Sequence, residues 1–213
     1  MPSFRRKLSA AKTSFIAEID RLARFDAENQ RRFGAMLGRA NGLSPKQLHL
    51  LTESVFFTAF REYEAFVRDV FVLYCLEKEP SSGKRVRSYL RPRNFAHAEQ
   101  LMQSSMPFLD WTNPATVIDR AELYLQDGFP VKLPFTTNQD VLRDYKRIRN
   151  HIAHGSSQSM VEYKKVLRKH YTTVPLVTPA PGEFLLATER NRANQYKLLT
   201  FFDLMRAMAN DLT

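Results

Sequence analysis

A helix start signal followed by a long apolar stripe organises the first half of the chain. Ser44, Pro45 and Gln47 form a capping box with proline in the first turn, where proline favours a helix. The predicted helix runs to about Glu79, before the break at Pro80-Ser81-Ser82-Gly83. Its apolar side chains recur at helical spacing and form a stripe typical of a core or a dimer interface, made of Phe56, Phe60, Tyr63, Val67, Val70 and Tyr74.

The sequence pattern of most of the remaining chain also predicts helices, so the expected fold class is an all-α bundle. A long N-terminal helix is expected over Ser3–Leu37, with a break over Gly38–Gly42, and a C-terminal helix follows a Pro-rich loop or short hairpin. The other predicted ranges are helices over Asn113–Leu125, Thr137–His154, Ser157–Tyr171 and Glu189–Leu212, and the loop or hairpin over Val174–Leu186. We expect residues 1–43 to be a helical extension and residues 44–213 the main helical domain, together forming one compact unit.

The string Arg149-Asn150-His151-Ile152-Ala153-His154-Gly155 ends one of these predicted helices, which Thr137 and Asp140 would open as a capping-box-like pair. Its apolar face is predicted to consist of Val141, Tyr145, Ile148 and Ile152, and its opposite face of Arg143, Arg147, Asn150 and His154. A metal-free ribonuclease needs such groups, because imidazoles can move protons near neutrality and arginine can stabilise a phosphate. The simpler interpretation is that Arg149 and His154 only complement the helix dipole.

The spacing of Arg149 and His154 leaves two arrangements open. Positions 149 and 154 lie roughly 140° apart around a helix, so both side chains do not point to one place. Asn150 and His154 share a face. Either Arg149 pairs with a carboxylate at the edge of the core, or a symmetric dimer brings two copies of the helix together.

Arg149-Asn150-x-x-x-His154 resembles the Arg-x4-His signature of HEPN domains. The full string resembles the version found in RiboL-PSP-type and neighbouring HEPN branches of bacterial toxin and phage-defence systems. A second point of similarity is Tyr63–Asp69, where Glu64 matches an acidic position of these domains. The resemblance covers about Ser44 to His170 and implies a helical domain that dimerises across the motif and cleaves RNA without a metal.

The roles follow from this resemblance together with the residue chemistry. His154 is the expected general acid/base, Arg149 the phosphate stabiliser and Asn150 a hydrogen-bond donor. Glu64 and His151 are expected to support them, with Glu64 paired to Arg149. No cofactor is expected, the products carry 2',3'-cyclic phosphate and 5'-OH ends, and a toxin would have a neutralising partner protein. The alternative is a non-catalytic RNA-binding or protein-interaction module that uses the motif as a dimer interface.

An excess of basic residues favours a polyanionic partner. The chain has 32 Lys and Arg against 22 Asp and Glu, a net charge of +10, so nucleic acid is the first expectation and an anionic membrane the second. Expected RNA contacts are Arg143, Lys146 and Arg147 on the motif helix, and Arg85, Arg87 and Arg91 around Tyr89. An exposed basic loop without a partner explains the second group equally well.

Other classes of protein find little support in the sequence. Cys75 is the only cysteine, which excludes an intrachain disulfide and a Cys-rich zinc site. His151 and His154 have a spacing that can hold a metal on a helix, but no carboxylate accompanies them in sequence, so no metal site is expected. No run approaches the roughly 20 apolar residues of a membrane span and no signal peptide is evident, so a cytoplasmic protein is expected.

Overall fold

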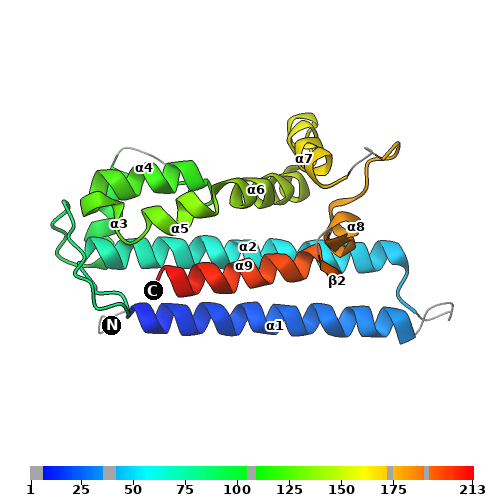
Figure 1. Cartoon of the computed structure of the whole chain (residues 1–213), viewed down its shortest axis with the longest axis horizontal. Coiled ribbons are helices and arrows are strands. Elements are labelled where there is room, and N and C mark those ends of the chain that lie inside the picture. Colours follow the sequence, from blue (N-terminus) through cyan, green and yellow to red (C-terminus); the bar gives the residue numbers. More distant parts are fainter. Residues whose placement is uncertain (1–6, 36–41, 105–108, 172–174, 190–191) are drawn as a thin grey trace. The chain divides into compact units, whose positions relative to one another are not determined.

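Helices form almost all of the regular structure, which confirms the all-α prediction (Figure 1). The computed structural model describes residues 7–35, 42–104, 109–171, 175–189 and 192–213. Its helices are α1 (Leu8–Ala35), α2 (Pro45–Cys75), α3 (Phe95–Gln103), α4 (Pro114–Tyr124), α5 (Lys132–Thr137), α6 (Gln139–His154), α7 (Ser157–His170), α8 (Pro181–Leu186) and α9 (Lys197–Asp211). A 3-10 turn, η1 (Gln126–Gly128), follows α4, and strands β1 (Thr188–Glu189) and β2 (Arg192–Tyr196) pair antiparallel.

The start of α2 has the predicted capping box. The Ser44 backbone N–H donates to Gln47 Oε1 at 2.8 Å, and the Gln47 backbone N–H donates to Ser44 Oγ at 3.3 Å. The predicted stripe from Phe56 to Tyr74 is buried. The helix ends at Cys75, four residues before the predicted end, because Glu77 takes a left-handed backbone conformation with φ of 56° that no α-helix contains.

The chain divides into two compact units. The first unit contains Met1–Ile16, Glu62–Arg143 and Ala207–Thr213, and the second contains Ala17–Arg61 and Asp144–Arg206. The boundaries fall inside α1, α2, α6 and α9, so each of these helices contributes a segment to each unit. The predicted division at residue 43 stays a prediction.

Aromatic side chains fill the core of the first unit. The rings of Phe15 and Phe66 stack with centroids 4.5 Å apart, and Phe71 lies against Trp111 at 5.2 Å. The buried Tyr74 hydroxyl donates to the Leu212 carbonyl at 2.5 Å. The short helices α4 and α5 also pack together in this unit (Figure 1). Aromatic area and a satisfied buried hydroxyl together stabilise this core.

The second unit has its own aromatic cluster and a close helix contact. Phe201 lies 4.7 Å from Phe56 and 4.9 Å from Tyr145 between ring centroids. A Cβ atom on Gly182 would lie 2.2 Å from the His49 carbonyl oxygen. Only glycine therefore fits where α8 approaches α2. This unit contains the motif at the end of α6.

The start of one predicted helix was wrong, and two short helices were missed. The helix expected from Thr137 begins at Gln139, because Thr137 is the last residue of α5 and the Asn138 side chain donates back to the Pro134 carbonyl at 2.9 Å. Helices α3 and α5 were not predicted, and the predicted break over Gly38–Gly42 lies almost wholly outside the described residues.

The predicted bounds of the elements after residue 174 also differ from the structure. Val174–Leu186 was expected to be a loop or hairpin, but its end forms α8, and the hairpin lies later, at β1 and β2. The expected helix over Glu189–Leu212 therefore begins only at Lys197. Tyr196 explains part of this difference, because its hydroxyl donates to the buried Asp26 carboxylate at 2.7 Å and fixes the strand by a tertiary contact.

Candidate functional site

The motif occupies the last two turns of α6 and the corner that leads into α7. Gly155 ends α6 with φ of 56°, a left-handed conformation that glycine adopts without strain, and its N–H donates to the His151 carbonyl at 3.0 Å. Ser156 then caps α7, since its side chain accepts from the Ser159 N–H at 3.2 Å. The two-residue connection brings the last turn of α6 beside the first turn of α7.

Arg149 is held by two contacts with uncharged groups. Its guanidinium carbon lies 5.2 Å from the centroid of the Phe57 ring on α2, a cation–π distance. Its Nη1 atom donates to Asn150 Oδ1 at 3.2 Å. Phe57 and Asn150 are both uncharged, and both belong to the second unit, as Arg149 does. The cation is therefore positioned without being neutralised by them.

His154 and Asn150 lie on one face of α6, four residues apart, as predicted. His154 is exposed and Asn150 is half-buried. The exposed imidazole is accessible to solvent and to a bound substrate. The sequence thus placed Arg149, Asn150 and His154 correctly at one helix end.

His151 is held by two side chains of α7. Its Nδ1 atom lies 3.1 Å from Ser159 Oγ on α7, and its ring stacks on Tyr163 with centroids 5.0 Å apart and an interplanar angle of 14°. Burial lowers the pKa of His151, and the nearby Glu53 carboxylate opposes that shift. The neutral imidazole is favoured as a result.

Ser159, Tyr163 and Glu53 were not predicted from the sequence. Ser159 is eight residues beyond His151 and reaches it only because the chain reverses at Gly155. A usable signal was present in Ser156 and Ser159, whose spacing after a helix-ending glycine is typical of a helix cap.

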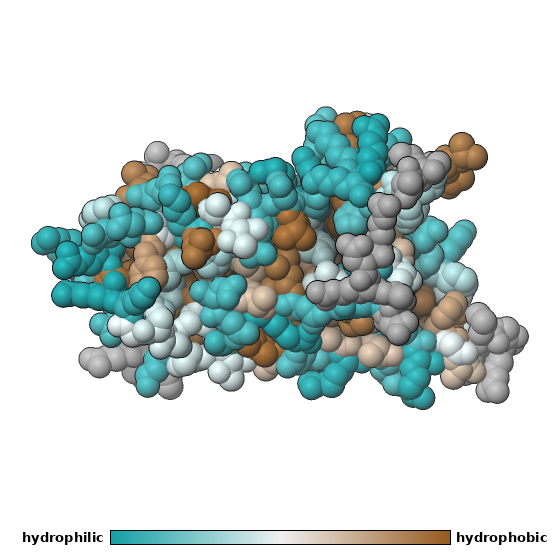
Figure 2. All heavy atoms as spheres, in the orientation of Figure 1, coloured by the Kyte–Doolittle hydropathy of each residue, from teal (hydrophilic) through white to brown (hydrophobic). Residues whose placement is uncertain are grey.

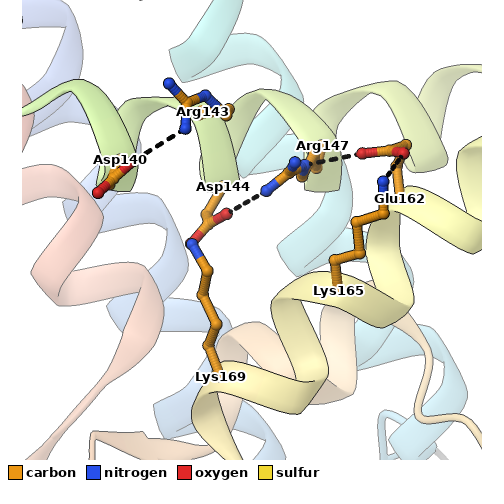
Figure 3. A network of polar contacts seen from close by, with 7 residues as sticks. All are labelled: Asp140, Arg143, Asp144, Arg147, Glu162, Lys165 and Lys169. Carbon is orange, nitrogen blue, oxygen red and sulfur yellow. Dashed lines mark hydrogen bonds and ion pairs between the residues drawn. The ribbon is translucent and has the colours of Figure 1, made fainter.

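A network of ion pairs lies along α6 and α7 beside the motif (Figure 3). Arg147 donates to Asp144 and to Glu162, both at 2.9 Å, and only 20% of its side chain is exposed. Asp144 also pairs with Lys169 at 2.7 Å, and Glu162 pairs with Lys165. Two carboxylates thus already surround Arg147. Its predicted contact with RNA stays a prediction.

Arg143, Lys146 and Glu64, the other residues predicted to act at the motif, differ in exposure. Arg143 is 41% exposed and pairs at 2.9 Å with Asp140, which is 82% exposed (Figure 3). Exposed pairs of this kind contribute little to stability and open easily. Lys146 and Glu64 are half-buried. Glu64 belongs to the first unit and Arg149 to the second, and their pairing stays a prediction.

The residues Lys84–Arg91, here called the basic segment, form an extended stretch of the first unit. Its backbone is fixed by two hydrogen bonds of 2.9 Å, from the Tyr89 N–H to the Tyr124 carbonyl and from the Gln126 N–H to the Arg87 carbonyl. The side chains alternate, with Val86 fully buried. The exposed positions of the segment are Lys84, Arg85, Arg87, Tyr89 and Arg91.

The basic segment therefore displays predicted RNA contacts on a fixed backbone. Tyr89 is 64% exposed, and within the described part of the chain Arg85, Arg87 and Arg91 form no ion pair. Exposed arginines beside an exposed ring suit phosphate contact and base stacking. On the face shown in Figure 2, the surface of α7 is mostly hydrophilic.

The described residues contain neither a metal-binding cluster nor a membrane-spanning helix. Among those residues no three His, Cys, Asp or Glu side chains come together as a metal site. No helix in the same ranges has the length and apolar character needed to cross a membrane. Comparison with family models, curated proteins and solved structures finds no match to this chain.

Proposed function

We propose that this protein is a metal-independent endoribonuclease of the HEPN type. The observation that supports the proposal is the end of α6, where Arg149 lies against the Phe57 ring and donates to Asn150, and His154 is exposed on the face of Asn150. A cation for the phosphate, an amide donor and a titratable imidazole are the groups that ribose 2'-OH attack requires.

In the proposed reaction the 2'-oxygen of RNA attacks the adjacent phosphorus. The bond from phosphorus to the 5'-oxygen breaks, and the products carry a 2',3'-cyclic phosphate and a 5'-OH. His154 acts as general acid/base, Arg149 stabilises charge on the phosphate oxygens, and Asn150 donates a hydrogen bond. A homodimer across the motif, a neutralising partner and a role as a toxin or defence effector are parts of the same proposal, which follow from the family resemblance.

The decisive experiment compares the wild type with His154→Ala on mixed cellular RNA in EDTA. We expect cyclic-phosphate ends from the wild type alone, with cleavage lower by about 10²–10⁴-fold in the variant, the range for a general acid/base. His49→Ala is the matched control, because His49 lies on α2 in the same unit and outside the motif. Loss of wild-type cleavage in EDTA, or equal cleavage by His154→Ala, contradicts the proposal.

A second candidate function is a non-catalytic RNA-binding module, and the basic segment favours it. A fixed backbone with exposed Arg85, Arg87 and Arg91 can bind single-stranded RNA without any reaction. This candidate predicts that the wild type binds RNA and leaves it intact in every buffer. Binding with cleavage that depends on His154 excludes it.

A further inference from the structure

The hydrogen bonds of Ser159 restrict the proton position on His151. Ser159 is buried, and its hydroxyl donates to the Ser156 carbonyl at 2.8 Å. A serine hydroxyl has one hydrogen and two lone pairs. The hydrogen is thus committed to Ser156. Ser159 Oγ can only accept from its other two neighbours, which are Ser156 Oγ at 3.2 Å and His151 Nδ1 at 3.1 Å.

This hydrogen-bond pattern favours the hydrogen on Nδ1 of His151. A neutral imidazole has one N–H, so the remaining nitrogen, Nε2, has a free lone pair. Among the described residues Nε2 has no hydrogen-bond partner. The stacked Tyr163 ring holds the plane of the imidazole. Ser159 and Tyr163 thus orient His151 as a hydrogen-bonded carbonyl or carboxylate orients a catalytic histidine.

We propose that Nε2 of His151 is the general base that takes the proton from the RNA 2'-OH, and that His154 of the same chain is the acid. This inference rests on the proposed ribonuclease function. It differs from an arrangement in which two His154 side chains from two copies share the tasks. Residues three apart on a helix have Cβ atoms about 5–6 Å apart, so one helix turn can supply both imidazoles.

The proton balance of the step is complete. The 2'-OH proton moves to Nε2 of His151 as the bond between the 2'-oxygen and phosphorus forms. The imidazolium of His154 gives its proton to the departing 5'-oxygen as the bond to phosphorus breaks. After the step His151 is protonated and His154 is neutral, and exchange with water restores both.

The environment of His151 suits a base more than an acid. Burial lowers the pKa of His151, which keeps the ring neutral near pH 7. The groups around it are Ser159 and Tyr163 on α7 and Glu53 on α2, of which Glu53 raises the pKa and opposes burial. The Glu53 carboxylate also accepts the Gly182 N–H at 2.9 Å, which holds it in place.

The first test is structural and needs no RNA. Long-range ¹H–¹⁵N correlation spectra of the full-length protein at neutral pH distinguish Nδ1–H from Nε2–H for each of the five histidines. The His151 signals are assigned by their loss in His151→Asn. We expect His151 as the Nδ1–H tautomer, with Ser159→Ala moving it toward Nε2–H. A predominant Nε2–H form in the wild type overturns the inference.

The second test measures cleavage in EDTA by His151→Asn and Ser159→Ala. Asparagine keeps an N–H donor for Ser159 but has no base, so we expect binding and the unfolding midpoint to be retained and cleavage to fall by about 10²–10⁴-fold. Added imidazole should partly restore cleavage by His151→Ala, which a purely structural histidine does not allow. In Ser159→Ala, the rising limb of the pH–rate profile should shift.

The outcomes separate this inference from the proposed function. If the wild type cleaves RNA and His151→Asn cleaves it equally well, the base role of His151 is overturned and the ribonuclease function stays in place. A wild type that cuts no RNA overturns both. Should His151→Asn fail to fold, the wild-type tautomer and the profile of Ser159→Ala still decide the question.

Discussion

The arginines at the end of α6 and those of the basic segment are held in opposite ways. Around α6 the side chains are fixed, Arg147 by two carboxylates and Arg149 by Phe57 and Asn150. In the basic segment the backbone is fixed, and Arg85 and Arg87 extend into solvent. Fixed side chains suit a reaction that requires precise placement, and exposed ones on a fixed backbone suit binding. The difference teaches that the basic residues behind the net charge of +10 are held in at least two distinct ways.

The largest expected effect separates catalysis from binding. Arg149→Ala should lower cleavage by about 10²–10³-fold, the cost of removing one group that stabilises transition-state charge. Affinity for a non-cleavable RNA should change little, because the basic segment is intact. The measurement is single-turnover cleavage together with fluorescence anisotropy. Equal losses of cleavage and affinity would remove the distinction between the two regions.

The second effect concerns affinity alone. Replacing Arg85, Arg87 and Arg91 by alanine should weaken binding of single-stranded RNA and reduce the salt slope of log K by about 2, near 0.7 per lost phosphate contact. Titrations at several salt concentrations measure this slope. An unchanged slope would mean that the basic segment is only a solvated loop.

A smaller effect compares the two regions through stability. Arg147→Ala leaves Asp144 and Glu162 with only their lysine partners, so the free energy of unfolding should fall by about 1–2 kcal/mol. Arg85→Ala, the matched control, should change it by less than about 0.5 kcal/mol. Urea unfolding curves give both values. Equal stability of the two variants would contradict the proposed difference in how the arginines are held.

The smallest effect is a pH dependence of stability. Because the pKa of His151 is lowered from 6.5 in the folded state, the unfolded state binds more protons as pH falls below 6.5. This stabilising contribution is therefore present above pH 6.5 and lost at lower pH. His151→Asn should lose less stability than the wild type between pH 7 and 5, measured by urea unfolding. The pKa of His170 is also lowered, and this background is common to both proteins.

The elements predicted correctly are those specified by residues close together in the sequence, such as a helix cap or an apolar stripe. Ser44 and Gln47 bond to each other as expected, and the stripe from Phe56 to Tyr74 is buried. The hairpin at β1 and β2 was missed because Tyr196 is fixed by Asp26, which is 170 residues away in the chain. Local patterns do not contain such a contact.

The same limit applies to the candidate site. Arg149, Asn150 and His154 were found because one short string at the end of a predicted helix contains all three. The exposure of His154 follows from its place at the helix end. The tautomer of His151 could not be predicted, because it depends on Ser159, which approaches only after the chain turns at Gly155. The turn at Gly155 brings Ser159 to His151, a contact that helical spacing along the sequence does not predict.

The backbone bonds of the basic segment have a consequence for the evolution and engineering of this protein. Tyr89 and Arg87 are fixed to the first unit through main-chain atoms, which every residue except proline supplies in full. The exposed side chains at positions 85, 87, 89 and 91 can therefore be exchanged while the path of the chain is kept. Under the proposed RNA-binding role, the segment is a surface on which a changed affinity can be selected without a new fold.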